Sequence, residues 1–556
     1  MHVKLSDMLS AAPVRKYGPI TLLLIVLTAA LTYEAKHTGL TVDEPSHFAA
    51  AYVYWLGQDV LVPPDTPPLT RIICGWVPLL RRAPDPRQSG HWRARDAYLI
   101  GSEILGVRGR VGRAMLFYTR LPFLIFPLGI SFLCWYWGRI LFSEVVALLL
   151  AACSAMEPTI LGHGPLINSD VPAAFAAFWF TYALWAYWRN PTRARLAFMA
   201  LTLLVALLTK FTLLPLLPLG SVAALYRGPR VLAAILIPTV LYGGLLAASQ
   251  FQARPLSEQK IAELERAGVP HVLRPIARAA GVLPWPSQFI EGLLFIGGSL
   301  RGHGFTGYLL GHKIEGWVPW YFPFAWLVKF PIPLQLLTAA GLMELILRIY
   351  RQRADTADAL IWGTAFVLFG LAVLSNFHIG FRHLLPVLPL FTFGSGAGLQ
   401  RWLGYRSGRL VIAGGVVFLA LSSSLVYPHG ISYFNEWVGG PKNGWKYLAD
   451  SNIDWGQNYP ELGAYLSRHR VDCARIFTMS YDNPWHYTGP GSLSPQPLPP
   501  EATEAVFRPE PGTYAISVNF LTGLLLPTGR EDYLAEFRRR TPIGRAGYSI
   551  LIFVIN

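Results

Sequence analysis

The chain has 556 residues, of which 53% are hydrophobic and only 14% are charged. Because a soluble domain carries about 25% charged residues, this composition excludes an ordinary soluble protein and indicates a polytopic membrane protein. The formal net charge of +15 does not indicate nucleic-acid binding, since the Lys and Arg residues stand mostly between apolar runs and no zinc-finger, helix-turn-helix or RNA-binding pattern is present. Membrane topology and lipid headgroups account for these cations better.

Recurring apolar runs predict about eleven membrane-spanning helices. The first run follows Arg15 and Lys16 and has no convincing cleavage site after it, so we expect a retained signal-anchor helix. The expected spans are residues 17–33, 114–137, 140–156, 171–188, 196–209, 211–226, 231–249, 331–349, 359–375, 384–400 and 410–427.

Basic residues in the short connectors set the expected topology. If Lys210 separates two spans, every short basic connector falls on one side of the membrane, as the positive-inside rule requires. The N-terminus is then cytoplasmic, and the tail after Tyr427 lies outside the inner membrane. The same parity brings several polar segments together on the outer face, namely loop 34–113, residues 167–170, Lys210, loop 250–330 and residues 376–383.

The non-membrane segments have different expected structures. Residues 47–55 are predicted to form an amphipathic helix at the membrane interface, and loop 250–330 is predicted to hold a charged helix at about 256–267 and an aromatic end at 317–326. The sequence thus predicts an all-α transmembrane domain over 1–427. It also predicts a small extracytoplasmic α/β domain over 428–556, with strands at 514–520 and 548–555 and helices at 459–468 and 531–540.

Histidine and cysteine residues give no metal signature, because no close pair has ligand spacing on a helix. The sequence leaves open a carboxylate–metal site assembled by folding, so the cofactor is unknown and the chemistry below requires none. Cys74 and Cys473 fall in non-membrane segments and could pair if both face an oxidising space.

Three carboxylates are candidates for catalysis. Asp43 and Glu44 follow the first span, where carboxylates are placed sparingly, so a merely solvated pair is the weaker interpretation. One such carboxylate suffices as a general base if it reaches an acceptor hydroxyl. Asp170 stands at the outer start of a span, although Asp before an apolar run that opens with Pro is also a common helix cap.

The cations on the same face could bind a phosphate. Arg382 and His383 precede a span, and a guanidinium beside free helix N–H groups forms an anion site at headgroup depth. Lys210 and, less strongly, Arg120 lie on the same side. The alternatives are an ordinary interfacial Arg for Arg382 and a lysine that snorkels from a helix end for Lys210.

A polar segment after the last span has the composition of a sugar-binding surface, in which Trp stacks on sugar rings and Asn, Asp and Gln bind hydroxyls. A structured turn region is the equal alternative. The expected contacts are Asn435, Glu436, Asp454, Trp455 and Gln457.

Together these groups match one reaction. A sugar linked through phosphate to a polyprenol has a good leaving group, so transfer needs a base for the acceptor and positive charge on the departing phosphate. A single displacement of this kind inverts the anomeric centre. A transporter or lipid flippase is the first alternative, but the candidate charges lie at the outer edge and no repeat is evident. A membrane-anchored envelope assembly protein is the second.

The ordered set of motifs resembles the C-type membrane glycosyltransferases of glycosyltransferase family 39, which include the dolichyl-phosphate-mannose protein mannosyltransferases and the aminoarabinose transferases. The segments after the last span are similar to a bacterial subgroup. The matching pieces are Asp43-Glu44, Asn168-Ser169-Asp170, Leu208-Thr209-Lys210-Phe211, Tyr321-Phe322-Pro323, Lys329-Phe330-Pro331, Arg382-His383-Leu384-Leu385-Pro386, Tyr433-Phe434-Asn435-Glu436 and Asp454-Trp455-Gly456-Gln457.

This resemblance implies a GT-C fold, with a polyprenyl-phosphate-linked sugar as donor and a protein, lipid or glycan as acceptor. Asp43 would be the catalytic base, with Glu44 and Asp170 shaping the acceptor and donor sites and Asn168 contacting substrate. Arg382 and Lys210 would hold the lipid phosphate, together with His383 and Arg120. His383 departs from the aromatic residue expected there, and the tail shows no β-trefoil repeat, which argues against protein mannosylation.

Overall fold

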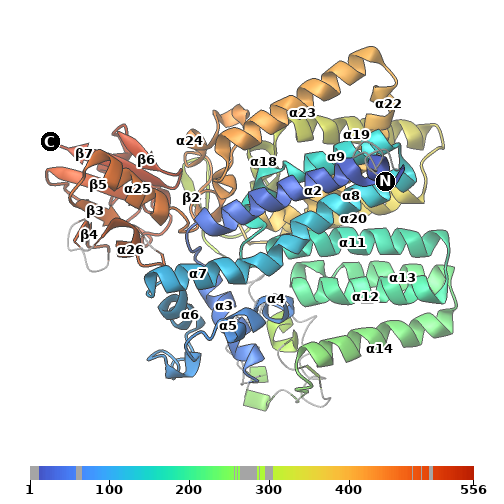
Figure 1. Cartoon of the computed structure of the whole chain (residues 1–556), viewed down its shortest axis with the longest axis horizontal. Helices are drawn as coiled ribbons and strands as arrows, with labels where there is room; N and C mark the ends of the chain where they lie inside the picture. The colour runs from blue at the N-terminus through green and yellow to red at the C-terminus, as the bar shows by residue number, and fades with distance from the viewer. Residues whose placement is uncertain are drawn as a thin grey trace, which may run out of the picture.

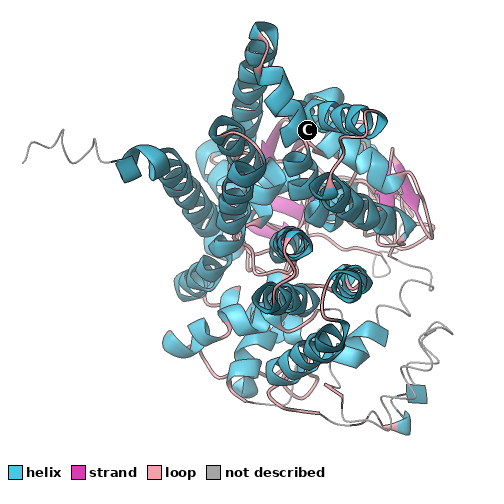
Figure 2. Cartoon of the chain, turned by 90° about the vertical axis from the view of Figure 1, so that its right-hand side faces the viewer, coloured by secondary structure: helices cyan, strands magenta, loops and turns pink. Residues whose placement is uncertain are grey.

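The computed structural model describes residues 12–57, 66–253, 255, 257–259, 261–262, 285–286, 289–294, 305–478, 480–489, 491–499 and 505–556, with side chains from Tyr17 onward. Long helices lie side by side in a bundle, and a small α/β unit stands at one end of it together with the C-terminus (Figure 1). Figure 2, turned by 90°, looks along many of these helices and shows several of them end-on. This end of the bundle, next to the α/β unit, is called the domain end below.

Six helical segments of the described chain are long and apolar enough to cross a membrane, which agrees with a polytopic membrane protein. Five of them are largely exposed, as a lipid-facing helix requires, with α14 and α23 as examples, whereas more than half of the apolar window of Gly109–Leu141 is buried. The six are Tyr17–His37 in α2 (Ala12–His37), Gly109–Leu141, α14 (Arg230–Ala248), α19 (Ile332–Tyr350), α20 (Thr356–Leu374) and α23 (Arg406–Val426).

A second group of apolar helices is packed inside the bundle. The helix α11 (Asp170–Arg189) is buried along most of its length and contacts α12 and α8, as expected of a helix that is hydrophobic on all sides. Shorter helices complete this group: α9 (Glu144–Ala155), α10 (Pro158–His163), α12 (Arg193–Thr209) and η3 (Phe211–Leu213). The helix α13 (Leu216–Arg227) is more exposed, with Val222 and Tyr226 open to its surroundings.

Helical structure thus occupies each expected span, but several spans are interrupted. The run at 211–226 divides into η3 and α13. Gly109–Leu141 consists of α7 (Gly109–Arg120), η2 (Leu121–Leu124) and α8 (Ile125–Leu141), with a proline at the start of η2. The run at 384–400 divides into η5 (Phe381–Val387), α21 (Leu388–Gly394) and α22 (Gly396–Leu403). Pro386 and Pro389 lack the N–H that a continuous helix needs, which accounts for the change from η5 to α21.

The segment after α2 is folded against the bundle. Its helices are α3 (Glu44–Trp55), α4 (Leu69–Cys74), α5 (Trp76–Leu80), η1 (Pro86–Gln88) and α6 (Ala97–Leu105). The expected interfacial helix at 47–55 is instead a packed one, because Phe48 and Tyr52 are buried and the Tyr52 hydroxyl donates to the Ala83 carbonyl at 2.8 Å. A Cβ on Gly101 would lie 1.9 Å from the Pro45 carbonyl, so α6 approaches α3 more closely than a side chain permits.

The 250–330 segment is described only in part, and most of the charged helix expected at about 256–267 lies outside the described residues. Its end forms the hairpin of β1 (Gly307–Leu309) and β2 (His312–Ile314), followed by α18 (Tyr321–Lys329). Trp317 and Trp320 are exposed there, whereas Tyr321 and Phe322 are buried. Cys74 and Cys473 are free thiols, the first buried and the second exposed, so the pairing left open by the sequence does not occur.

The C-terminal region contains a five-stranded mixed sheet in the order β4-β3-β5-β7-β6, of which β3, β4 and β5 are parallel. Its strands are β3 (Ala474–Phe477), β4 (Leu493–Pro495), β5 (Gly512–Ser517), β6 (Gly544–Ala546) and β7 (Ile550–Ile555). Its short helices are η6 (Gly430–Ser432), η7 (Glu436–Val438), α24 (Pro441–Gly444), η8 (Asp450–Asn452), α25 (Tyr459–His469), α26 (Trp485–Thr488), α27 (Val518–Leu521) and α28 (Ala535–Arg538).

The expected strands and helices of this region agree with the structure in part. The strand expected at 514–520 ends at Ser517, whose side chain caps α27, and the helix expected at 531–540 shortens to α28. The strand expected at 548–555 and the helix expected at 459–468 correspond to β7 and α25.

Candidate active site

Four charged side chains, distant in sequence, meet in one cluster at the domain end. Arg382 Nη1 lies 3.0 Å from Asp43 Oδ2 and 3.5 Å from Asp170 Oδ2. Lys210 Nζ lies 2.5 Å from the other oxygen of Asp170. The structure therefore brings together the base candidate and both of the main phosphate candidates, and this set is called the open cluster below.

Local structure explains how each member reaches the open cluster. Asp170 is the first residue of α11, and its N–H donates to Asn168 Oδ1 at 3.0 Å. Lys210 follows the last turn of α12 in an extended conformation. Asp43 is the cap residue of α3. Arg382 lies in η5, at a break in the bundle rather than on a continuous helix.

The segment after the last span supports Arg382 from the other side. Its guanidinium lies over the Trp455 ring at 4.3 Å, and its Nε donates to Ser451 Oγ at 3.1 Å. A Cβ on Gly380 would lie 2.3 Å from the same Ser451 oxygen, so a side chain here would displace the Ser451 hydroxyl. Asn452 Oδ1 accepts from the Phe381 N–H at 2.9 Å. These contacts fix the guanidinium in place before any ligand arrives.

Exposure differs within the open cluster in a way that suits catalysis. The Asp170 side chain is 2% exposed, whereas those of Arg382, Lys210 and Asp43 are 13%, 14% and 23% exposed. Asp43 is thus the more accessible of the two carboxylates in the open cluster, and one of its oxygens has no hydrogen bond among the described residues. A ligand can reach Asp43, whereas the buried Asp170 mainly positions the side chains of Arg382 and Lys210.

Asp450 is a further carboxylate of this region, and the sequence did not single it out as a site residue. Burial raises its pKa to about 6, although the N–H of Ser451 and the charge of Arg382 lower it. Its backbone is left-handed, with φ of 60°. Asp450, Ser451 and Asn452 lie inside the polar segment that the sequence predicts to bind sugar, although they are not among the expected contacts.

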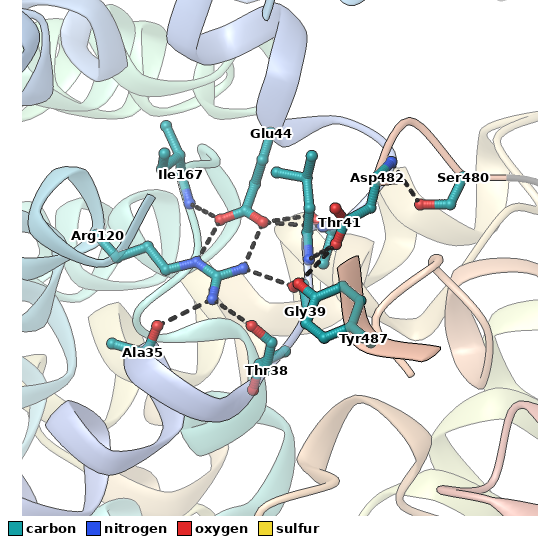
Figure 3. Close-up of polar contacts among 11 residues, drawn as sticks. Ala35, Thr38, Gly39, Thr41, Glu44, Arg120, Ile167, Ser480, Asp482 and Tyr487 are labelled. Atoms are coloured by element: carbon teal, nitrogen blue, oxygen red, sulfur yellow. Dashed lines mark hydrogen bonds and ion pairs between the residues drawn. The ribbon is translucent and has the colours of Figure 1, made fainter. Parts of the chain in front are cut away.

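Glu44 lies beside Asp43 in sequence but in a different environment (Figure 3). Arg120 Nε donates to Glu44 Oε1 at 2.7 Å and its Nη2 to Oε2 at 2.6 Å. The same carboxylate accepts from the Ile167 N–H at 3.1 Å and from Thr41 at 3.0 Å. The side chains of Glu44 and Arg120 are at most 1% exposed, and this ion pair is called the closed pair below.

The closed pair has no capacity left for a substrate. Arg120 also donates to the carbonyls of Ala35, Thr38 and Gly39 at 2.8–3.0 Å. Burial acts to raise the pKa of Glu44, but the charge and hydrogen bonds of Arg120 outweigh it and hold that pKa below its usual value. The geometry differs from the expected substrate role of Glu44 and phosphate role of Arg120, and it makes both structural.

Of the five residues expected to contact a sugar after the last span, only Trp455 touches the open cluster. The others bind neighbouring parts of the chain, as the turn alternative predicts. Asn435 Nδ2 donates to two α18-region carbonyls, Glu436 accepts from Ser422, Asp454 accepts from Ser517 and the Gly456 N–H, and Gln457 donates to Ser432 and the Ile453 carbonyl.

A buried lysine ties this segment to the bundle. Lys329, at the end of α18, is 1% exposed and donates to the carbonyls of Ile431 and Asn452. Because Asn452 in turn holds η5 through Phe381, Lys329 positions the turn that supports Arg382. The sequence marked Lys329 only as part of a motif.

An apolar cavity of about 250 Å³ adjoins the open cluster. Its walls come from η3 and the following turn, from the end of α20 and from η5, and they include Phe211, Leu371 and His383. Lys210 and Arg382 directly precede Phe211 and His383 in the chain. His383 Nε2 is buried and has no hydrogen-bond partner in the described part of the chain. Cations therefore stand next to a hydrophobic space.

No group of three or more His, Cys, Asp and Glu side chains suited to a metal ion occurs among the residues that the structure describes. The chemistry of the open cluster is argued below from its own side chains.

Comparisons with known proteins give distant structural likenesses only. No protein-family profile and no curated protein sequence matches the chain. It is similar to the structure of ArnT from Cupriavidus metallidurans in the apo state, at 12% identity and a TM-score of 0.47, over 96% of this chain and 97% of that chain. The chain is also similar to the structure of the same protein bound to undecaprenyl phosphate, at 11% identity and a TM-score of 0.41, over 96% of this chain and 98% of that chain.

A third likeness is to the Archaeoglobus fulgidus oligosaccharyltransferase in the apo form, at 12% identity and a TM-score of 0.44, over 92% of this chain and 72% of that chain. Likenesses at this identity and TM-score do not establish a family. The function is therefore argued from the contacts of the open cluster.

Proposed function

We propose that the chain is an inverting glycosyltransferase that moves a sugar from a polyprenyl-phosphate donor to an acceptor hydroxyl. The observation that carries this proposal is the open cluster, in which the accessible Asp43 pairs with Arg382 and the buried Asp170 joins Arg382 to Lys210, with an apolar cavity alongside. A base, two cations and a hydrophobic space are what an amphiphilic phosphate donor needs.

The donor phosphate would enter as a new partner for the cations. Arg382 and Lys210 are each held by a carboxylate at present, and Arg382 is shared by two. A phosphate that takes over Arg382 releases Asp43 and places negative charge where the leaving group forms. The polyprenyl chain would extend into the apolar cavity past His383.

Asp43 would then act as the general base. It accepts the proton of an acceptor hydroxyl while the oxygen attacks the anomeric carbon, and the bond to the phosphate oxygen breaks. The leaving polyprenyl phosphate carries its own negative charge, so no acid is needed to protonate it. One displacement inverts the anomeric configuration. Asp170 positions both cations and takes no proton in this scheme.

The finer assignment follows the resemblance of the sequence. The donor would carry a hexose or pentose, and the acceptor would be a protein, lipid or glycan on the outer face of a bacterial inner membrane. The N-terminus would be cytoplasmic and residues 428–556 extracytoplasmic. The fold would be GT-C, in a bacterial subgroup of glycosyltransferase family 39.

The test combines a strain and the purified protein. Mass spectrometry of envelope glycans should show the same missing sugar in a deletion strain and in a strain that carries Asp43→Asn, while Asp532→Asn, an exposed control, restores it. Purified protein should convert the matching polyprenyl-phosphate sugar to an inverted product. Movement of that lipid across proteoliposomes with no glycosyl product would instead establish a flippase and refute the proposal.

A further inference from the structure

A second cavity lies next to the closed pair, with which it shares Ala35 and Thr38. It measures about 320 Å³ and is lined by the end of α2, by α7 and by α25 and α26. Four of its lining side chains are basic or can become so, namely Lys36, His37, Arg113 and His486. No lining residue is an Asp or Glu. This space is called the basic cavity below.

The basic side chains of this cavity are exposed, and the charge of the nearby Asp482 acts on one of them, His486. In the described part of the chain neither Lys36 nor Arg113 forms an ion pair, although Arg113 lies over the Tyr487 ring at 5.0 Å. The Tyr487 hydroxyl donates to Asp482 at 2.9 Å, but that carboxylate is buried and also accepts from the Asn483 N–H.

Simpler roles explain these residues one at a time. Lys36 and His37 occupy the last turn of α2, where cations are favourable because of the helix dipole. Arg113 gains a cation–π contact with Tyr487. These roles do not explain why side chains from two helices of the bundle and one of the C-terminal region face the same cavity. Like charges that converge on one cavity repel one another, and a bound anion lowers that cost.

We propose that the basic cavity binds a phosphate group, presented either by a lipid headgroup or by a soluble phosphate-bearing ligand. Arg113 supplies a planar guanidinium and Lys36 an ammonium, which together suit the oxygens of one phosphate. The site goes beyond the proposed transfer reaction and does not depend on it, because its residues are separate from the open cluster.

The basic cavity contacts both the closed pair and the C-terminal region. The carbonyls of Ala35 and Thr38, which line the cavity, accept from Arg120 in the closed pair (Figure 3). A phosphate bound there therefore lies behind the ion pair whose other member, Glu44, directly follows Asp43. The C-terminal region contributes His486 and Tyr487, so the ligand would also join this region to the bundle.

The experiment uses the full chain in nanodiscs of a neutral phosphatidylcholine. A lysine-reactive reagent labels Lys36, and mass spectrometry measures its labelling relative to the exposed Lys442 in the same molecule. The probes are inorganic phosphate in one arm and phosphatidic acid mixed into the nanodisc in the other. Phosphate chemistry in the basic cavity predicts selective protection of Lys36 in at least one arm, and the arm identifies the source.

Matched variants separate a binding site from general electrostatics. Arg113→Ala should need about tenfold more probe for the same protection, whereas Arg113→Lys should recover part of it and Arg110→Ala, on the same helix, should match the parent. Asp43→Asn should protect Lys36 normally, so failure of the glycosyltransferase proposal does not affect this result. Equal labelling of Lys36 with and without both probes, or equal protection in Arg113→Ala and Arg110→Ala, would overturn the inference.

Discussion

Asp43 and Glu44 are adjacent in the chain, yet each forms an ion pair of a different kind. The Asp43 side chain is 23% exposed and meets one guanidinium through one oxygen, whereas that of Glu44 is 1% exposed and accepts from Arg120, Thr41 and Ile167. Arg120 is saturated by carbonyls, while Arg382 is shared between two carboxylates. One pair can exchange a partner, and the other cannot.

The contrast follows from the cost of separating charges at different depths. A buried pair that loses one partner leaves an uncompensated charge, which costs about 3–5 kcal/mol. The pair of Asp43 and Arg382 is only partly buried, and a ligand phosphate that replaces Asp43 supplies the same negative charge, so the exchange leaves no uncompensated charge. The closed pair is therefore suited to holding the fold, and the open cluster to binding and chemistry.

The largest effect on activity is expected for Asp43→Asn. Loss of a general base lowers transfer by about 10²–10⁴-fold, while the amide keeps the size of the side chain. Binding of the donor should change little, since Arg382 and Lys210 are intact. Single-turnover transfer and donor binding, measured on the same preparation, test both statements. Transfer at the parental rate would remove Asp43 from the mechanism.

A substitution in the closed pair should lower the stability of the fold rather than act directly on the transfer reaction. Glu44→Gln leaves the Arg120 guanidinium buried without a counter-charge, which should destabilise the protein by about 3–5 kcal/mol. Thermal unfolding in detergent, followed by loss of the monodisperse peak in size exclusion, should show a large drop in midpoint, and Asp43→Asn a small one. Equal drops in the two variants would erase the distinction between the pairs.

Acid should reproduce the effect of Glu44→Gln. Because the folded protein lowers the pKa of Glu44 below its usual 4.5, the stability that this group contributes is fully present above 4.5 and is lost as the pH falls through the folded value. The unfolding midpoint of the parent should therefore decline on acidification below about 4.5 more steeply than that of Glu44→Gln. Parallel curves would mean that Glu44 does not contribute this dependence.

Removing a phosphate partner should have an intermediate effect on donor binding. Lys210→Ala deletes one charge-assisted contact, which corresponds to about 10–100-fold in affinity for the polyprenyl-phosphate donor. Lys442→Ala, an exposed lysine of the C-terminal region, is the matched control. Titration of the donor in nanodiscs measures both. Unchanged affinity in Lys210→Ala would place the phosphate elsewhere.

Much of the open cluster could be predicted because topology alone decides which loops share a face. Apolar runs and basic connectors were enough to bring Asp43, Asp170, Lys210 and Arg382 to the same end of the bundle. This inference needs only the number and order of the membrane spans, which the hydropathy of the sequence indicates clearly. The predicted positions of the membrane helices agree with the structure for the same reason.

The division of labour between Asp43 and Glu44 could not be predicted in this way. Successive residues of a helix point about 100° apart, so the rotation of α3 decides which carboxylate meets Arg120, and that rotation is set by packing against α6. Ser451 and Asn452 also went unassigned, since uncharged polar residues in a turn carry no periodic signal. Their role depends on a contact with η5, about seventy positions away in the chain.

The smallest expected effect concerns Asp450, and it probes the open cluster from its buried side. Because burial raises the pKa of Asp450 to about 6, the group gains its negative charge only as the pH rises through that value. This charge competes for Arg382 and repels the donor phosphate, so donor affinity of the parent should fall severalfold between about pH 5 and 7. The donor is a phosphodiester and does not itself titrate in this range.

Asp450→Asn should remove this dependence while preserving the local fold. Asn tolerates the left-handed backbone at this position and keeps an oxygen for the Ser451 N–H. Its donor affinity should be flat with pH and match that of the parent at the acidic end. A parental pH profile in Asp450→Asn would mean that another group titrates. A flat profile shows instead that the buried edge of the open cluster tunes a site whose accessible edge performs the chemistry.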